Sequence, residues 1–358
     1  MSLKLALERK DFKDLLAEVV ERGLCIGCGS CAAACPLAVI SIEDEIPVQK
    51  VKCFDDTVCE CCYYQCPKSA QPIEELESKT FGRKRNIDEH LGVTLAMHSA
   101  KTRLGEVMNV GQDGGIVSSL LIYALEEGVV DCAVVTGVSS KEPWRPIPKL
   151  AFTKDDILRT AGTKYTSSPT LLGLASALEE YGMSKVAFVG TPCQILAVRK
   201  AQFHPSASYK LGEITKLAIG LFCMESFSYR DLILGYIKSE KGIDPGRISK
   251  FQIKKGRFFA IADGKKVIDV PISEMKQYAK NGCHVCGDLT AELADISVGS
   301  IGSPEGWSTV IIRNEKGRSI FEAAASKGLI EYKPVSEAGV KLLVKISEEK
   351  RKQSESKV

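Results

Sequence analysis

The sequence predicts a small, cysteine-rich α+β module near the N-terminus, followed by a larger α/β domain that carries a small β-meander. Three observations support this prediction. Nine of the 14 cysteines in this 358-residue chain fall between residues 25 and 66, at spacings typical of metal ligands. Runs typical of buried strands and of helices alternate from residue 93 onward. Three short β-type runs then follow one another in residues 248–271.

Residues 1–22 are predicted to form an N-terminal amphipathic helix, which Gly23 ends. Its apolar side chains share one stripe at helical spacing: Leu5, Phe12, Leu15, Leu16, Val19 and Val20. This charged segment lacks the apolar centre of a signal peptide, and no apolar stretch of the chain approaches the ~20 residues that span a bilayer. We therefore expect a cytoplasmic protein, either free or bound at the cytoplasmic face of a membrane complex.

Residues 23–77 are predicted to form a ferredoxin-like module for two 4Fe-4S clusters. The run C-x2-C-x2-C-x3-C-P, which is the bacterial-ferredoxin signature, consists of Cys25, Cys28, Cys31 and Cys35 followed by Pro36. The fourth cysteine of that signature binds a different cluster from the first three, so a second half should follow. Residues Cys59, Cys62 and Cys66-Pro67 repeat the end of the pattern, with Cys53 upstream.

In two-cluster ferredoxins, the fourth cysteine of each run binds the other cluster, and this rule divides the cysteines into two sets of ligands. The first cysteine set is Cys25, Cys28, Cys31 and Cys66. The second cysteine set is Cys35, Cys59, Cys62 and one further thiolate, for which we favour Cys53. The regular pattern would place that ligand at Asp56, and Cys61 is the alternative, although it directly neighbours Cys62. A zinc module fits poorly, because zinc sites use paired C-x2-C knuckles.

Four more cysteines form the third cysteine set: Cys193, Cys223, Cys283 and Cys286. The first two follow predicted parallel strands at their carboxyl ends, where α/β domains assemble their sites. Spacing alone is equally compatible with a third cubane cluster, with a zinc ion at 283–286, and with burial of Cys193 and Cys223 as small apolar residues. We expect Cys132 to be a core residue and His284 not to be a ligand.

The remaining segments divide the chain further. Residues 78–92 are polar and basic and are predicted to be a linker, and residues 93–345 form the α/β domain. Within it, residues 248–271 are predicted to form the β-meander, with hairpin turns at Lys255-Gly256 and Asp263-Gly264. Residues 346–358 offer few apolar side chains for burial and are predicted to be a disordered tail.

Two loops that precede predicted helices are candidate cofactor sites. The Gly111-Gln-Asp-Gly-Gly115 loop has little side chain, so its backbone N–H groups can closely approach a flat or anionic ligand. The segment AGTKYTSS, residues 161–168, combines hydroxyls, a lysine and a glycine, which suit a phosphate. Neither loop matches a dinucleotide-binding or Walker motif, and ordinary loops often carry such residues.

Composition excludes two further classes of protein. The net charge of +3 is too small to indicate nucleic-acid binding. Because the cytoplasm keeps thiols reduced, the many cysteines are not expected to form disulfides.

Five segments together resemble the family formed by the beta subunits of coenzyme F-420 (F420) hydrogenases and dehydrogenases. They occur in the family's order between residue 93 and about residue 330: GQDGGIVSSLL, AGTKYTSSP, VGTPCQI, LFCMESF and the run C-x2-C-x3-T-x2-LADISVGSIG. With a two-cluster module in front, the arrangement resembles the electron-input subunits of F420H2 dehydrogenases.

The resemblance implies bound FAD, coenzyme F420 as substrate and a third 4Fe-4S cluster held by the third cysteine set. It implies that the flavin lies against Gly111, Gln112, Gly114 and Gly115, with its ribityl-phosphate portion near Thr163, Lys164 and Tyr165. The complete fold prediction is an α+β ferredoxin-like two-cluster module followed by an α/β flavin-binding domain with a small β-meander.

The implied function is an oxidoreductase that moves a hydride between reduced F420 and bound FAD and then passes single electrons through 4Fe-4S clusters. No side chain need act as acid or base, so none is predicted to be catalytic. The expected redox partner is a membrane dehydrogenase complex, heterodisulfide reductase or ferredoxin. The basic residues Lys254, Lys255 and Arg257 are either an attractor for the anionic tail of F420 or, as we favour, a solvated edge.

Three alternatives stay open from the sequence. Two are family relatives with another donor or acceptor, namely a formate dehydrogenase beta subunit and a ferredoxin-linked reductase. The third is a passive iron–sulfur relay subunit without flavin turnover.

Overall fold

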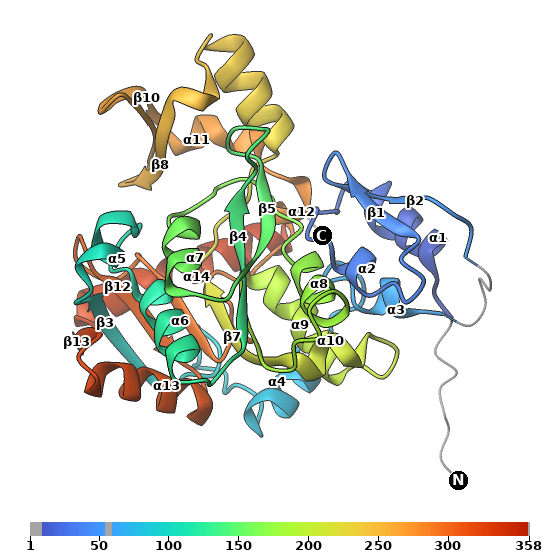
Figure 1. Cartoon of the computed structure of the whole chain (residues 1–358), viewed down its shortest axis with the longest axis horizontal. Helices are drawn as coiled ribbons and strands as arrows, with labels where there is room; N and C mark the ends of the chain where they lie inside the picture. The colour runs from blue at the N-terminus through green and yellow to red at the C-terminus, as the bar shows by residue number, and fades with distance from the viewer. Residues whose placement is uncertain (1–8, 54–58, 357–358) are drawn as a thin grey trace.

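The computed structural model describes residues 9–53 and 59–356. The cysteine-rich module lies at one side of the α/β domain, and the three-stranded sheet with the neighbouring helix η2 projects beyond it (Figure 1). The end of the chain returns to the junction between the module and the α/β domain (Figure 1). The chain therefore has the predicted organisation: a ferredoxin-type region first, then mixed α/β structure.

The N-terminal module consists of short helices around one antiparallel hairpin, in which β1 pairs with β2. Its elements are α1 (Phe12–Leu15), η1 (Leu16–Val20), α2 (Ser30–Ala33), β1 (Ile40–Glu43), β2 (Ile46–Gln49), α3 (Cys61–Tyr64) and α4 (Ile73–Phe81). Helices α2 and α3 each begin inside one of the two cysteine runs. The two halves of the sequence repeat therefore have similar local structures.

Two predicted boundaries of this module are wrong. The first helix begins at Phe12, because the Asp11 side chain accepts hydrogen bonds from the backbone of Lys13 and Asp14 and so caps it; residues 1–8 lie outside the described part of the chain. Helix α4 continues through residues 78–81, which were predicted to be linker. It continues because it buries Leu76 and Glu77 and ends only at Gly82, which has a positive φ of 73°.

The α/β domain is built on one eight-stranded mixed sheet with the strand order β13-β3-β12-β11-β7-β6-β4-β5. Its strands are β3 (Ala96–Thr102), β4 (Cys132–Val138), β5 (Pro146–Ala151), β6 (Val186–Gly190), β7 (Thr215–Leu221), β11 (Ile296–Gly299), β12 (Ser308–Ile312) and β13 (Ile330–Pro334). Strands β11, β7, β6 and β4 are parallel to one another, as the buried apolar runs predicted for β6 and β7. The outer strands pair antiparallel.

Helices cover both faces of this sheet. They are α5 (Gly105–Val110), α6 (Ile116–Glu126), α7 (Lys154–Thr160), α8 (Leu172–Glu179), α9 (Pro192–Phe203), α10 (Tyr209–Ile214), α12 (Asn281–His284), α13 (Glu315–Ser326) and α14 (Glu337–Glu355). One apolar core joins the sheet to α6, α7 and α13. A second core joins the other face to α8, α9 and α10, and it includes Ile26, Ala33 and Leu76 of the module. The module is therefore packed onto the α8–α10 face as part of one core.

The predicted β-meander is confirmed. Strands β8 (Ile248–Lys254), β9 (Arg257–Ala262) and β10 (Lys265–Pro271) pair antiparallel in the order β10-β9-β8. Both hairpin turns have two consecutive positive φ angles, as type I′ turns require: 49° and 72° at residues 255–256, and 51° and 72° at residues 263–264. A separate apolar core joins this sheet to η2 (Tyr229–Glu240), α11 (Ile272–Met275) and η4 (Lys276–Tyr278); η3 (Pro245–Arg247) precedes β8.

The predicted disordered tail is wrong, because residues 346–355 are the second half of helix α14. The helix buries Leu343, Ser347, Lys350 and Ser354 along one side. Long polar side chains can cover apolar surface with their stems and place their charged ends on partners elsewhere in the fold. The prediction, which counted only apolar residues, therefore underestimated how well this segment packs.

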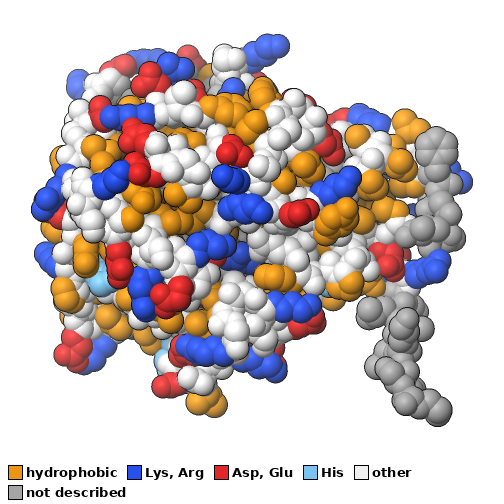
Figure 2. All heavy atoms as spheres, turned by 60° about the horizontal axis from the view of Figure 1, so that its bottom comes forward, with side chains coloured by type: hydrophobic (Ala, Val, Ile, Leu, Met, Phe, Trp, Pro, Cys, Tyr) orange, Lys and Arg blue, Asp and Glu red, His pale blue; other side chains and the backbone are white. Residues whose placement is uncertain are grey.

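The face that the bottom of Figure 1 presents carries Lys and Arg side chains interspersed with acidic and apolar ones (Figure 2). No helix in residues 9–53 and 59–356 is long and apolar enough to cross a membrane.

Candidate functional site

The first cysteine set is brought together at the N-terminus of α2. All four of its cysteines line one cavity, together with apolar residues of the module such as Leu15 and Ile26. Burial raises the pKa of the Cys28 and Cys31 thiols well above their usual value, and the Cys66 thiol raises both further. Cys66 therefore lies beside the loop that carries the other three, although it belongs to the second half of the sequence repeat.

The second cysteine set also gathers, around Cys62. Burial raises the pKa of the Cys62 thiol, and the Cys59, Cys35 and Cys53 thiols raise it further. The Gln49 side chain donates a hydrogen bond of 3.3 Å to the Cys53 sulfur. Cys53 is therefore close enough to the set to act on Cys62.

The rival ligand Cys61 is also near this set. Burial and the Cys59 thiol raise the pKa of Cys61 to about 11, with a smaller contribution from Cys35. Residue Asp56, where the regular pattern would place the ligand, lies outside the described residues. The choice between Cys53 and Cys61 therefore stays a prediction.

The third cysteine set converges from three segments at the carboxyl edge of the parallel strands. Cys193 starts α9 directly after β6, Cys223 follows β7, and α12 carries Cys283 with Cys286 just beyond it. Burial raises the pKa of Cys193 to about 12, and the Cys286 and Cys283 thiols contribute. The pKa of Cys223 is raised by burial and by the other three thiols of the set.

The donor sets have the chemistry of iron–sulfur cluster ligands. Each set gathers thiols, which are the usual ligands of 4Fe-4S clusters. Within the described part of the chain, no three His, Cys, Asp or Glu side chains lie close enough together to hold a single metal ion. Cys132, predicted to be a core residue, is fully buried in β4 and joins none of the sets.

The first set lies next to each of the other two sets. The thiol of Cys193, from the third set, contributes to the raised pKa of Cys28, from the first set. The thiol of Cys62, from the second set, contributes to the raised pKa of Cys31, also from the first set. The first set therefore has electrostatic neighbours in both of the others.

Backbone contacts hold the module against the α/β domain at this junction. The Leu171 N–H donates to the Cys28 carbonyl at 3.3 Å, and the Ser167 hydroxyl donates to the Ile26 carbonyl. Gly29 has a positive φ of 81°, and a side chain there would meet the Pro169 carbonyl at 3.0 Å. The segment that follows the predicted phosphate loop therefore packs directly on the first cysteine set.

The predicted glycine loop connects α5 to α6, but packing accounts for two of its glycines. A Cβ at Gly114 would lie 2.4 Å from the Ala100 carbonyl, and the Gly114 N–H donates to the Ser308 hydroxyl at 3.0 Å. Gly115 has a positive φ of 69° and is closely packed on Thr102. The Gly114 N–H is thus engaged inside the protein, and the partly exposed residues at the loop tip are Gln112 and Asp113.

The second predicted cofactor segment adjoins this loop. Gly162 faces the Val110 carbonyl: a Cβ added at Gly162 would lie 3.6 Å from the Val110 carbonyl oxygen. The Lys164 ammonium donates to the carbonyls of residues 160–162, and burial lowers its pKa to about 8. The Tyr165 hydroxyl accepts a hydrogen bond of 3.1 Å from the backbone of Ile253 on β8. Thr163, between Gly162 and Lys164 in the sequence, is partly exposed.

The β-meander faces the same loops. Burial raises the pKa of Asp113, and Lys254 and Lys250 on β8 oppose that shift, so both lysines lie near the glycine loop. Lys254 also pairs with Glu305, and Arg257 pairs with Asp269. Two of the three basic residues considered for the F420 tail therefore already have acidic partners, as a solvated edge would.

Three family models match the chain. The model described as coenzyme F420 hydrogenase/dehydrogenase, beta subunit N-term, matches residues 97–175, and its counterpart for the C terminus of the same beta subunit matches residues 183–338. A 4Fe-4S binding domain matches residues 18–41. Together the two beta-subunit models cover more than half of the chain.

Curated relatives and one solved structure agree with these matches. The coenzyme F420 hydrogenase subunit beta of Methanothermobacter thermautotrophicus is 41% identical over 75% of this chain and 95% of its own. The F subunit of the F(420)H(2) dehydrogenase of Methanosarcina mazei is 33% identical over 94% of this chain and 92% of its own. The coenzyme F420-dependent sulfite reductase of Methanocaldococcus jannaschii is 35% identical over 95% of this chain but 53% of its own.

The solved structure is a chain of the F420-reducing [NiFe] hydrogenase complex from Methanosarcina barkeri. It superposes with a TM-score of 0.72 at 38% identity, over 76% of this chain and 94% of its own.

Proposed function

The chain belongs to the family of coenzyme F420 hydrogenase/dehydrogenase beta subunits, and on that premise we propose that it is an F420H2 dehydrogenase. In this proposal, FAD exchanges a hydride with F420, and three 4Fe-4S clusters carry single electrons to a partner protein. The observation that carries it is the convergence of twelve cysteines into three neighbouring sets. The third set is joined to the second proposed cofactor segment, because the Ser226 N–H donates to the Cys283 sulfur and the Phe227 N–H donates to the Tyr165 carbonyl.

The length of the match favours a dehydrogenase over the other family activities. The hydrogenase beta subunits match about three quarters of this chain, whereas the F subunit of the dehydrogenase matches nearly all of it and is itself matched nearly end to end. The sulfite reductase is about half covered by this chain. The N-terminal module therefore supports assignment to the dehydrogenase type.

The residues at the glycine loop would bind and shield the flavin. Gly111 and Gln112 would present the loop to the ring system, with Gln112 at the partly exposed tip, while Gly114 and Gly115 let the loop pack closely on the sheet. Lys164, whose charge is buried without a carboxylate partner in the described residues, would place a positive charge near an anionic portion of the cofactor. Tyr165 would fix the β8 strand over the loop through its hydrogen bond to Ile253.

The cysteine sets would hold the clusters and exclude water from them. The thiols of the first and third sets are mostly enclosed by apolar residues of the module and of α8 and α9. Excluding water from a cluster fixes its reduction potential, because that potential changes with solvent access. The proposed partner is a membrane dehydrogenase complex, heterodisulfide reductase or ferredoxin, and the protein would be cytoplasmic or peripheral on such a complex.

Metal and flavin analysis of anaerobically purified, reconstituted protein tests this proposal. About twelve irons and one FAD per chain are expected from three 4Fe-4S clusters. Cys223→Ser should lose about four irons, whereas Cys132→Ala, which removes a fully buried thiol outside the sets, should lose none. About eight irons without flavin would instead support the passive relay.

A second assay separates the enzyme alternatives. Reduced F420, but not NADH or formate, should bleach the flavin absorbance of the loaded protein. Bleaching by formate or by reduced ferredoxin alone would support a formate dehydrogenase beta subunit or a ferredoxin-linked reductase.

A further inference from the structure

Two lysines are buried beside the cysteine sets although neither belongs to the N-terminal module. Lys200, on α9, is fully buried, and Lys350, on α14, is 5% exposed. The Lys200 ammonium donates to the Cys66 carbonyl at 2.6 Å, to the Ala70 carbonyl at 2.8 Å and to the Ser69 hydroxyl at 2.9 Å. Both positions lie on helices, and nothing in the local sequence marks them.

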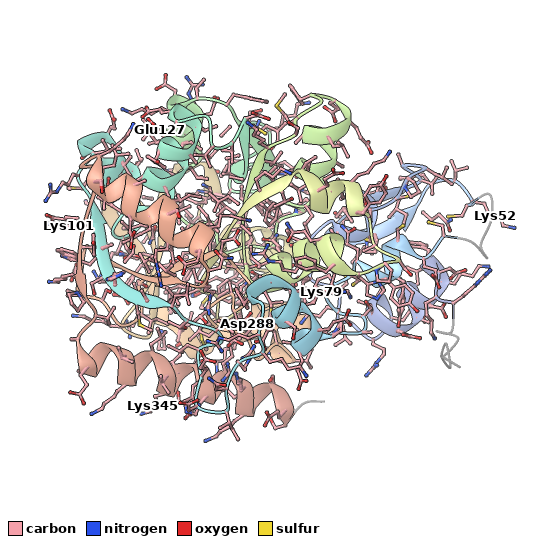
Figure 3. All side chains as sticks on the ribbon, turned by 90° about the horizontal axis from the view of Figure 1, so that it is seen from below. Lys52, Lys79, Lys101, Glu127, Asp288 and Lys345 are labelled. Carbon is pink, nitrogen blue, oxygen red and sulfur yellow. The ribbon has the colours of Figure 1, made fainter. Side chains whose placement is uncertain are left out.

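Lys350 makes the corresponding contacts at the third cysteine set. Its ammonium donates to the Cys223 carbonyl at 2.5 Å and to the Asp288 carbonyl at 2.6 Å. Asp288 follows Cys286 by two residues and lies toward the interior, on the side of α4 and α14 (Figure 3). Each lysine therefore donates to the backbone of one cysteine of a set, Lys200 at the first and Lys350 at the third.

In the part of the chain that the structure describes, neither ammonium is within ion-pair distance of a carboxylate, although the Asp288 carboxylate acts on Lys350 from nearby and, against the effect of burial, helps to raise its pKa. Within residues 9–53 and 59–356, neither lysine forms a salt bridge. The nearby Asp288 carboxylate accepts a hydrogen bond from the Glu292 backbone instead. Buried charges are normally paired, because removing an ammonium from water is costly. A buried ammonium that forms no salt bridge and lies beside four thiols points to a further counter-charge, supplied by what those thiols bind.

A 4Fe-4S cluster with four thiolates supplies such a charge, since it is an anion that gains one more negative charge on reduction. Net charge and hydrogen bonds near the ligands set its reduction potential. We infer that Lys200 and Lys350 are the resident counter-cations of the clusters in the first and third cysteine sets, and that each raises the reduction potential of its own cluster. This inference rests on the three clusters of the proposed function.

Both lysines are positioning residues in this scheme, since they touch backbone carbonyls and not the reacting atoms. A purely structural role would be to attach α9 and α14 to the loops they contact. The two roles differ in one measurable quantity, the midpoint potential, because a neutral side chain of similar length keeps the packing but removes the charge.

The test is a redox titration of each cluster, followed by electron paramagnetic resonance on loaded protein. Lys200→Met should make only the first-set cluster harder to reduce, and Lys350→Met only the third-set cluster, with the other midpoints unchanged. Lys210→Met and Lys345→Met are matched controls on exposed helix positions, and they should leave every midpoint at the wild-type value. Lys345 lies on α14 at the edge of the molecule (Figure 3).

Iron and sulfide analysis accompanies every titration. If Lys→Met variants with full iron keep wild-type midpoints, the inference is overturned while the proposed function stands. If the wild-type chain itself binds fewer than three clusters, the proposed function fails first.

A second pair of variants applies if the Met variants lose their cluster. Replacing the lysine by Gln keeps a donor to the carbonyls but removes the charge, and replacing it by Arg keeps the charge. Loss of iron from Lys350→Gln with retention in Lys350→Arg supports the inference, as does a lowered midpoint in Gln alone. Equal midpoints, or equal loss of iron, in the Gln and Arg variants overturn it, and the same comparison applies at Lys200.

Discussion

Substitution of Gly282 provides the sharpest test of the contact between the module and helix α12 of the α/β domain. It lies on α12, directly before Cys283 of the third cysteine set. A Cβ at this position would lie 2.0 Å from the Leu24 carbonyl oxygen and 2.9 Å from the Ile26 side chain. Because a Cβ needs at least 3.0 Å, Gly282→Ala must move α12 away from residues 24–26 by about 1 Å in a close-packed interior.

The expected effect follows from overpacking alone, since the φ of Gly282 is not in the left-handed region. Forcing extra volume into a packed site typically costs about 1–3 kcal/mol of the free energy of unfolding. The displaced segments carry Cys283 and Cys25, so iron of the third and first sets should be lost together. Reversible denaturant unfolding monitored by circular dichroism, with iron per chain, measures both effects.

The matched control is Gly105→Ala at the start of α5. No atom lies within 4 Å of a Cβ there, and its φ is also not in the left-handed region. Replacing a helical glycine by alanine stabilises by about 0.5–1 kcal/mol. A Gly282→Ala protein that keeps full iron and unfolds like the Gly105→Ala protein would refute the proposed close contact between α12 and the module.

Three further predictions address separate parts of the molecule. Cys53→Ser should lose iron from the second set while Cys61→Ser keeps it, and the reverse result in iron analysis would make Cys61 the ligand. The Arg83 hydrogen bonds lower the pKa of Glu89 to about 2, below its usual 4.5. That group therefore stabilises the fold above pH 4.5 and loses this contribution as the pH falls toward 2, so acid unfolding of Glu89→Gln should show a shallower pH dependence. Ending the chain after Lys345 removes Lys350 and leaves the Cys223 and Asp288 carbonyls without that donor, which should cost about 1–3 kcal/mol in denaturant unfolding; an unchanged midpoint would contradict it.

The first and second cysteine sets could be grouped from the sequence because local spacing encodes them. Three cysteines two residues apart fit one short loop, and the cysteine before a proline points to the other cluster, so Cys66 could be grouped with Cys25 without any structure. The strand ends that carry Cys193 and Cys223 were predictable from buried apolar runs, since parallel strands end at one edge. The β-meander was marked by its two Lys-Gly and Asp-Gly turns.

What the sequence did not reveal depends on partners far along the chain. The polar end of α14 was predicted to be disordered because the carbonyl that receives Lys350 lies 127 residues away. The last turn of α4 was assigned to a linker because the partner of Glu77 is Arg85, beyond the helix end. Gly114 was expected to face a ligand, yet its N–H binds Ser308, 194 residues along. Polarity and glycine content describe a residue but not its partner.

The first cysteine set has neighbours on two sides. Cys28 precedes α2, whose N-cap is Gly29, and Cys31 lies within the helix. Cys28 has Cys193 of the third set as a neighbour, and Cys31 has Cys62 of the second. In the proposed function, electrons pass from the flavin to the third set and then through the first set to the second. A chain lacking the first cluster but retaining the other two should therefore still reduce its third cluster from F420H2 while its second cluster stays oxidised.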